Sequence, residues 1–278
     1  MRLLPNNFIL LSKKNARQKY HKKQICPHLK FGNKYANTKV KIEEVVSAII
    51  YKLQTGCQWR KLPMRQFFKR KYRWNSVFYH FVKWSKNGSW QRIWTILLEQ
   101  HKHLLDMSSV QLDGSHTAAK RGGEQVEYQG RKKCKTTNLL FLTDAQGLPL
   151  CCSEPIAGNH NDAHEIKTHF TSQLKAIQKS NIDTKGLFLN ADSGFDVKEL
   201  RNYCYQNDIH ANIATNKRNG QIQSQIFDEA LYKQRFVIER TNAWLDGFRT
   251  LLIRFETNKN HWKDWHIIAF MLILCRRL

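Results

Sequence analysis

The chain has 278 residues, of which 41% are hydrophobic and 12% aromatic, with 13 glycines and 5 prolines. This composition excludes disordered, collagen-like and low-complexity proteins, because it supplies enough apolar side chains for a core. Lysine and arginine total 46 against 22 aspartate and glutamate residues, a formal charge of +24 that indicates a polyanionic partner. Residues 1–112 contain 23 basic and 4 acidic residues (+19), and the remainder contains 23 and 18 (+5). The excess charge is therefore concentrated in the first part of the chain.

The seven cysteines form no Cys-x-x-Cys pair and are odd in number, which favours a reducing cytoplasm over a disulfide framework. Cys26, His28 and Cys57 match no standard zinc spacing. The first residues lack the long apolar segment of a signal peptide. The apolar run at 265–275 is shorter than the roughly 20 residues that cross a bilayer, so it predicts a buried core helix and no membrane partner.

The amino-terminal third is expected to consist of a basic arm and a small helical domain. Residues 1–40 are rich in lysine and asparagine with weak periodicity, which predicts a flexible basic arm or a poorly packed helix. Over 41–105 apolar residues recur every three or four positions and predict three short helices: one ends at Gly56, one ends at Gly88, and one begins with Ser89 as its N-cap. Such helices with lysine and arginine between them resemble a helix-turn-helix DNA-binding module. The alternative is a basic helical domain that merely covers the remainder.

Residues 106–278 carry a different pattern, in which short apolar runs alternate with amphipathic segments. Strands are expected at 110–112, 138–143, 148–152, 186–190 and 209–214. Helices are expected after Asn161-Asp162 and over 198–206. This order is typical of an α/β domain built on a mixed five-stranded sheet.

Two carboxylates close predicted strands. Asp113 follows the first strand and Asp192 the fourth, and the carboxyl ends of strands line the ligand crevice of open α/β sheets. Each could equally be a turn residue when taken alone. If the two strands are neighbours, the carboxylates converge.

A predicted helix over 227–255 adds a third acid. Its polar residues recur at spacings of three and four and so share one face: Tyr232, Arg235, Glu239, Asn242, Asp246 and Arg249. The alternative is a solvated face with ion pairs. Three carboxylates in so basic a protein suggest a site for Mg²⁺ or Mn²⁺, and two such ions can activate a water or 3′-hydroxyl for displacement at phosphorus.

Several motifs in this order resemble the DDE transposases of bacterial insertion sequences, in particular the insertion-sequence-five family (insertion-sequence-four/five-like). The similarity covers about 41–278. Its motifs are QLDGSHT at 111–117, YQGRKKCKTTN at 128–138, EPIAGNHND at 154–162, NADSGF at 190–195, RFVIERTNAWL at 235–245 and, in the amino-terminal region, YKLQTGCQWRKLP at 51–63 with WSKNG at 84–88.

The resemblance implies an RNase H-like catalytic domain over 106–278, preceded by a helix-turn-helix-like domain over 41–105. Asp113, Asp192 and Glu239 would be the catalytic residues and the metal ligands, holding two Mg²⁺ ions for which Mn²⁺ can substitute. The family's Tyr-Arg-Glu signature maps onto Tyr232, Arg235 and Glu239. Its usual basic residue seven positions after the glutamate is Asp246 here, which leaves Arg249 as the candidate for that phosphate contact.

Further DNA contacts are expected at basic loop residues. Arg131, Lys132, Lys133 and Lys135 lie between the first two strands and could grip the DNA backbone or form a solvated loop. The other expected phosphate contacts are Tyr232, Arg235 and Arg249 near the third acid, and Arg60 with Lys61 in the helical domain.

Two further groups of residues carry expectations. His160 and Asp162 could lie near the metal site, with a helix N-cap as the alternative role for Asp162. The tryptophans at 59, 84, 90 and 94 are expected in the core and not stacked on bases.

The expected function is that of a bacterial transposase, cytoplasmic and associated with the nucleoid. Its partners would be double-stranded DNA, both the terminal inverted repeats and the target, and a second copy in a homodimer. An RNase H-like nuclease is the first alternative, and the basic amino-terminal module disfavours it. A catalytically inactive DNA-binding regulator derived from a transposase is the second, and the presence of all three acids disfavours that.

Overall fold

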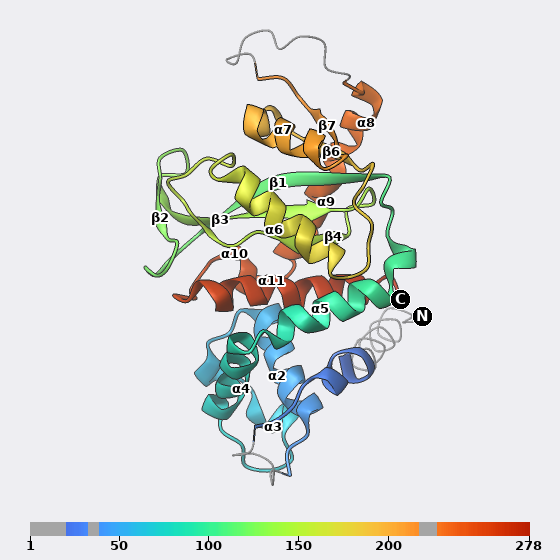
Figure 1. Cartoon of the computed structure of the whole chain (residues 1–278). Helices are drawn as coiled ribbons and strands as arrows, with labels where there is room; N and C mark the ends of the chain where they lie inside the picture. The colour runs from blue at the N-terminus through green and yellow to red at the C-terminus, as the bar shows by residue number, and fades with distance from the viewer. Residues whose placement is uncertain (1–20, 33–38, 217–226) are drawn as a thin grey trace, which may run out of the picture.

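The computed structural model describes residues 21–32, 39–216 and 227–278. Figure 1 shows the mixed sheet in the upper half and a cluster of helices in the lower half, with α5 (Ser89–Gln100) and α11 (Lys259–Leu274) between them. Most of the predicted arm lies outside the described residues. Of its described part, Ile25 and Leu29 are buried in the hydrophobic core. In the described parts of the chain, no helix combines the length and apolarity needed to traverse a bilayer.

The amino-terminal helices follow the predicted pattern. They are α2 (Ile42–Thr55), α3 (Met64–Phe67), α4 (Trp74–Lys86) and α5 (Ser89–Gln100), with single 3-10 turns η1 (Cys26–His28), η3 (Trp59–Lys61) and η4 (Lys102–Leu104). Helix α2 ends at Gly56, whose left-handed conformation (φ 68°) suits a residue without a side chain.

The expected cap of α5 is corrected by one residue. Gly88 is its N-cap, and Ser89 is already the first helical residue. Ser89 has this position because the side-chain oxygen of Asn87 accepts hydrogen bonds from both its backbone nitrogen, at 3.1 Å, and its hydroxyl, at 2.6 Å. The capping function therefore falls to a neighbour of the predicted residue.

The sheet is mixed, as predicted, and has the strand order of an RNase H-like domain. Its strands are β1 (Ser109–Ala118), β2 (Glu127–Gln129), β3 (Cys134–Thr143), β4 (Pro149–Cys152), β5 (Ile156–Ala157), β6 (Phe188–Ala191) and β7 (His210–Ile213). The order is β2-β3-β1-β6-β7, and β4 and β5 also pair with β3. Strand β1 is antiparallel to β3 and parallel to β6, which is parallel to β7. The two unpredicted strands, β2 and β5, are too short to show a period of two.

The helices of the second half are α6 (Ile166–Gln178), α7 (Lys198–Gln206), α8 (Glu229–Lys233), α9 (Val237–Asp246), α10 (Arg249–Leu252) and α11 (Lys259–Leu274), with 3-10 turns η5 (Ser193–Phe195) and η7 (Gln234–Phe236). The prediction of one continuous helix over 227–255 is therefore wrong. Phe248 adopts an extended conformation (φ −102°, ψ 100°) and is buried. The chain leaves the helix there because the aromatic ring turns into the core.

Helix α11 joins the two halves of the molecule. It lies between the sheet and the amino-terminal helices (Figure 1) and packs against α5, α4 and β4. Trp265 on this helix is fully buried, as the apolar run predicted, and so is Trp262, which precedes the run. Trp84, Trp90 and Trp94 of the amino-terminal helices are buried in the same continuous cluster, which confirms their assignment to the core. A shared core fixes the helical region relative to the sheet.

This junction predicts a pH-dependent stability. The pKa of Asp264 on α11 is raised to about 7, chiefly by burial and to a smaller extent by Glu154, while a hydrogen bond from Ser85 and the charge of Lys263 oppose the rise. The unfolded carboxyl titrates near pH 3.9, so between about pH 4 and 7 the folded protein holds more protons than the unfolded chain. The contribution of Asp264 to the free energy of unfolding should therefore fall as pH rises through this window.

Urea denaturation at pH 5.0 and pH 7.5 checks this, and Asp264→Asn should reduce the difference between the two values by about 1 to 4 kcal/mol. Asp208→Asn, which changes an exposed acid, is the control and should leave the difference unaltered. The same pH dependence in wild type and Asp264→Asn would contradict the assignment.

Candidate active site

Strand register brings two of the predicted acids together. Leu112 of β1 is paired with Ala191 of the parallel strand β6. Asp113 and Asp192 are the next residues, so they occupy equivalent positions on the two neighbouring chain segments. Asp192 directly follows β6, but the prediction that Asp113 ends its strand is wrong, because β1 continues to Ala118 in its pairing with β3. The carboxylate of Asp192 also accepts a hydrogen bond from the backbone nitrogen of Gly194 at 2.8 Å, as the N-cap of η5.

The third acid reaches the same place from α9, which packs against β1. Glu239 is exposed in the first turn of that helix, whereas Asp113 is half-buried. The pKa of Asp113 is raised to about 6, chiefly by burial; the guanidinium of Arg235 opposes the rise, and the carboxylates of Asp192 and Glu239 add to it. The three acids and Arg235 therefore act electrostatically on one another around Asp113.

Two buried asparagines attach the segment before α9 to the sheet. The Asn190 amide of β6 donates to the Leu231 carbonyl of α8 at 3.1 Å. The Asn212 amide of β7 donates to Asn190 Oδ1 at 2.8 Å and to the Asp228 carbonyl at 3.0 Å, and its own oxygen accepts from Asp228 N at 2.9 Å. Sequence reasoning missed both residues. The available signal was a polar amide inside each buried strand, which must find partners.

The turn between β3 and β4 packs directly against α9. The Thr241 hydroxyl donates to the Gly147 carbonyl, and the Arg240 guanidinium donates to the Gln146 carbonyl at 2.8 Å. Gly147 has a φ of 79°, and a Cβ there would lie 2.7 Å from the Val237 carbonyl oxygen. The turn therefore has to contain glycine for the helix to approach this closely.

Tyr232 and Arg235 of the Tyr-Arg-Glu signature lie together, whereas Arg249 lies apart from them. The Arg235 guanidinium lies 5.9 Å from the centroid of the Tyr232 ring, a cation–π distance. Arg249 begins α10 beyond the helix break, so it does not continue the face of Asp246 as the single helix predicted. Its backbone packs against Gly56 at the end of α2, where an added Cβ would lie 3.3 Å from the Arg249 carbonyl oxygen. Arg235 is thus the cation whose charge reaches Asp113.

Asp162 lies beside β1 and is not a helix N-cap, which corrects that alternative. Helix α6 begins at Ile166, with Glu165 in the cap position. Asp162 Oδ1 instead accepts from the Asn138 amide at 2.7 Å and lies 3.7 Å from His116 Nε2. It sits over Gly114, where any side chain would collide with it. The segment before α6 is thereby tied to β1 next to Asp113, and on its opposite face because strand residues alternate.

The predicted basic DNA contacts are exposed but lie on separate elements. Arg131, Lys132, Lys133 and Lys135 surround the turn between β2 and β3, and Lys132 donates to the His116 carbonyl at 2.8 Å. Arg60 and Lys61 lie on η3 in the helical region. His160 stacks on His164, with ring centroids 3.6 Å apart.

The acids suit a divalent cation by their chemistry, although their side chains are spread. Among the residues that the structure describes, no three histidine, cysteine, aspartate or glutamate side chains lie close enough together to form a ready-made metal site. All three donors are carboxylates, the ligand type that Mg²⁺ prefers. The raised pKa of Asp113 reflects burial and like charge, which a bound cation would offset. The donor set therefore fits such an ion.

The strand order defines the class of the second part of the chain, an RNase H-like domain. Residues 103–274 match the family described as "Transposase DDE domain", and residues 23–94 match the one described as "Putative transposase of IS4/5 family". Because the first match alone spans more than half of the sequence, the chain belongs to the DDE transposase family, which confirms the resemblance. The amino-terminal match begins inside the predicted arm. No curated protein matches the chain significantly.

Solved structures give weaker similarities. "Mos1 transposase paired-end complex with left transposon end" is 10% identical, with 83% of this chain and 77% of that chain covered at a TM-score of 0.30. "Crystal structure of the Mos1 mariner paired end complex with Mn" is 12% identical, with 95% and 86% covered at a TM-score of 0.29. The assignment of an RNase H-like fold rests on the strand order of the sheet.

The close contact between Gly147 and α9 predicts a large effect of a small substitution. Gly147→Ala would strain the backbone by about 1 to 2 kcal/mol and push α9 from the turn. Since Glu239 moves with α9, DNA cleavage should fall by about tenfold to a hundredfold. Thermal denaturation and a plasmid-nicking assay measure the two effects.

Gly186→Ala is the matched control, because Gly186 has a φ of 71° but nothing within 4 Å of an added Cβ. It should lower stability without changing the cleavage rate. Equal cleavage by both variants would show that the turn does not position Glu239.

Proposed function

We propose that Asp113, Asp192 and Glu239 hold two divalent ions, Mg²⁺ with Mn²⁺ as a substitute, for the reaction of this transposase. The reaction would be hydrolysis of DNA strands at the ends of an insertion sequence, followed by transfer of the 3′-hydroxyl ends to target DNA. The observation that supports the assignment is that the carboxylates of Asp192 and Glu239 act electrostatically on the half-buried carboxyl of Asp113. DDE transposases generally use divalent metal ions, and the family match supports the same assignment.

The residues around the acids have separate roles in this proposal. Carboxylates alone repel a phosphodiester, so the acids become useful to DNA only through a cation. When bound, such ions activate the attacking oxygen and stabilise the leaving oxygen. Arg235 places a fixed positive charge beside Asp113, where it can contact the phosphate next to the cleaved bond, and Tyr232 holds its guanidinium. The asparagines and Gly147 orient Glu239.

Binding of duplex DNA is assigned to the basic surfaces outside the site. Arg131, Lys132, Lys133 and Lys135 would contact the backbone beside the sheet, and Arg60, Lys61 and Arg249 would contact it near the helical region. The concentration of charge in residues 1–112 supports a role of that region in holding the inverted repeats. Joining two ends in one complex requires at least two copies of the chain, so we infer a homodimer on DNA in the bacterial cytoplasm.

Substitution of the acids tests the catalytic assignment. Asp113→Asn, Asp192→Asn and Glu239→Gln should each lower Mg²⁺-dependent strand cleavage and joining by at least about 1,000-fold, because each removes a charge that the ions require. The substrate is a plasmid carrying both ends of the DNA that flanks this reading frame. Affinity for the ends, measured by fluorescence anisotropy in EDTA, should change less than about threefold, since the contacts to the backbone remain.

Glu229→Gln is the control, because Glu229 is an exposed acid on the neighbouring helix α8. It should cleave like the wild type. Cleavage that survives in all three acid variants would rule out the assigned triad.

The salt dependence of DNA binding tests the proposed contacts to the DNA backbone. The logarithm of the association constant should fall linearly with the logarithm of salt concentration, with a slope of about −0.9 for each phosphate neutralised. Lys133→Gln combined with Lys135→Gln should make the slope less negative by about 2. Lys185→Gln, which changes an exposed lysine before β6, should leave it unchanged. A slope near zero for the wild type would contradict a backbone contact.

A further inference from the structure

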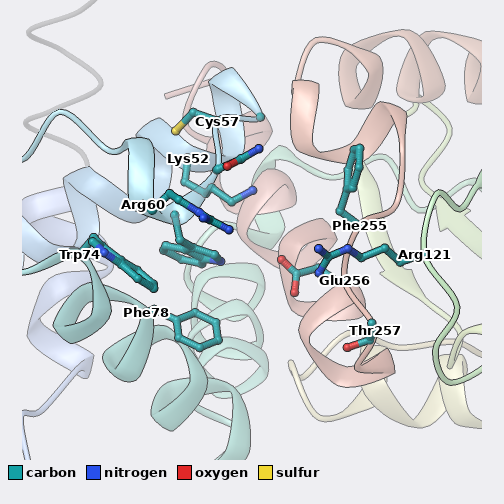
Figure 2. A pocket seen from close by; sticks show the side chains of 12 residues that line it. Lys52, Cys57, Arg60, Trp74, Phe78, Arg121, Phe255, Glu256 and Thr257 are labelled. Carbon is teal, nitrogen blue, oxygen red and sulfur yellow. The ribbon is translucent and has the colours of Figure 1, made fainter.

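A cleft of about 580 Å³ separates the helical region from the chain that follows β1 and α10. Figure 2 shows its two sides, with Trp74, Phe78 and Arg60 on the helical side and Arg121, Phe255 and Glu256 opposite. We call it the aromatic cleft. Its volume lies within the range of pockets that enclose small organic ligands, about 300 to 1,000 Å³. None of the roles assigned above to the acids or the turn of α9 uses it.

Aromatic rings form the helical wall. Trp59 is held by packing, with its ring centroid 5.2 Å from that of Phe78 and 5.8 Å from that of Trp265. Trp74, at the first turn of α4, remains 40% exposed. Packing therefore accounts for Trp59, but it leaves the Trp74 ring open to the cleft and to solvent. A rigid ring facing a cleft is a surface on which a flat ligand can stack.

Positive charges line the rim. Arg60 and Arg121 are exposed on opposite sides of the cleft. The one acid, Glu256, faces inward, where its carboxylate accepts a hydrogen bond from the Trp265 indole nitrogen at 3.1 Å. The Lys52 ammonium lies between the Trp59 and Trp265 rings, 5.7 and 5.5 Å from their centroids. The two arginines at the rim therefore attract an anion, while the carboxylate of Glu256 is hydrogen-bonded to the wall of the cleft.

A flat ring and a phosphate occur together in a nucleotide. Inside a duplex the base faces are covered by their neighbours, so only an unpaired base can stack on a protein ring. We propose that the aromatic cleft binds one unpaired nucleotide of the DNA substrate, with its base on the Trp74 and Phe78 rings and its phosphates between Arg60 and Arg121. This inference rests on the proposed function only in that DNA is the substrate.

The aromatic cleft is connected to the catalytic strand but distinct from its acids. Arg121 follows Asp113 by eight residues, which span at most about 29 Å. The end of β1 is fixed to the opposite wall, since Lys120 N donates to the Arg254 carbonyl at 3.0 Å and Arg254 N donates to the Ala118 carbonyl at 2.8 Å. The bound nucleotide would lie within about nine base-pair steps of the cleaved bond, at roughly 3.4 Å per step. An unpaired nucleotide held at this point would fix which phosphodiester bond of the DNA lies at the three acids.

Two labelled 30-base-pair duplexes of one arbitrary sequence test the proposal, one fully paired and one with three unpaired thymidines in the middle. Anisotropy in EDTA keeps the assay independent of catalysis. Full-length wild type should bind the unpaired probe at least about fivefold more tightly, as expected for one stacked base. Trp74→Ala should abolish this preference while binding of the paired probe persists, and Trp74→Phe should keep it.

The control is Tyr79→Ala, which removes an aromatic ring of nearly equal exposure, 41%, on the same helix but outside the cleft. Its preference should match the wild type. In addition, 5-iododeoxyuridine in the unpaired position should crosslink to Trp74 or Phe78, as mapped by mass spectrometry, which requires no variant.

Three results would overturn the proposal: equal affinity of wild type for the two probes, a preference that survives Trp74→Ala, or crosslinks confined to residues outside the cleft. Each would leave the triad untouched, because cleavage by the acid variants is measured separately. Conversely, a failed triad would not alter the preference for unpaired DNA.

Discussion

The parallel pairing of β1 with β6 is the constraint on which the site depends. It sets Leu112 opposite Ala191, so that the next residue on each strand, Asp113 and Asp192, is an acid at the same sheet edge. Two carboxylates at equivalent positions on adjacent segments repel each other, and burial of Asp113 increases the cost. The fold tolerates this unfavourable free energy, although uncharged side chains at the two positions would avoid it. Such an arrangement is typical of a site built for a cation.

The rest of the structure brings the third acid to that edge and keeps it there. One side of the α8–α9 segment is fixed by the amides of Asn190 and Asn212, and the other by the turn at Gly147. Glu239 itself stays exposed, so its position depends on these anchors more than on its own packing. The shared core along α11 then fixes the basic helical region relative to the sheet.

The elements with strong periodicity could be predicted from the sequence. Helix α2 was predicted from its apolar stripe, and α11 and the five longer strands from their apolar runs. Asp192 follows its strand as predicted, whereas Asp113 lies within β1, because pairing with β3 extends that strand to Ala118. The continuous helix over 227–255 was not correct, because its polar face keeps helical spacing through Gly247 while the burial of Phe248 breaks the helix. The Asp162 contact to Asn138 joins residues 24 apart, and no local pattern carries such a long-range hydrogen bond. The asparagine anchors and the aromatic cleft depend on tertiary contacts in the same way.

Mn²⁺ binding, measured by electron paramagnetic resonance with the protein on its end DNA, tests the assigned metal site most directly. We expect the wild type to bind two ions per active site, and Asp113→Asn to lose at least one of them while the DNA stays bound. The same number and affinity of ions in Asp113→Asn, Asp192→Asn and Glu239→Gln as in the wild type would contradict it.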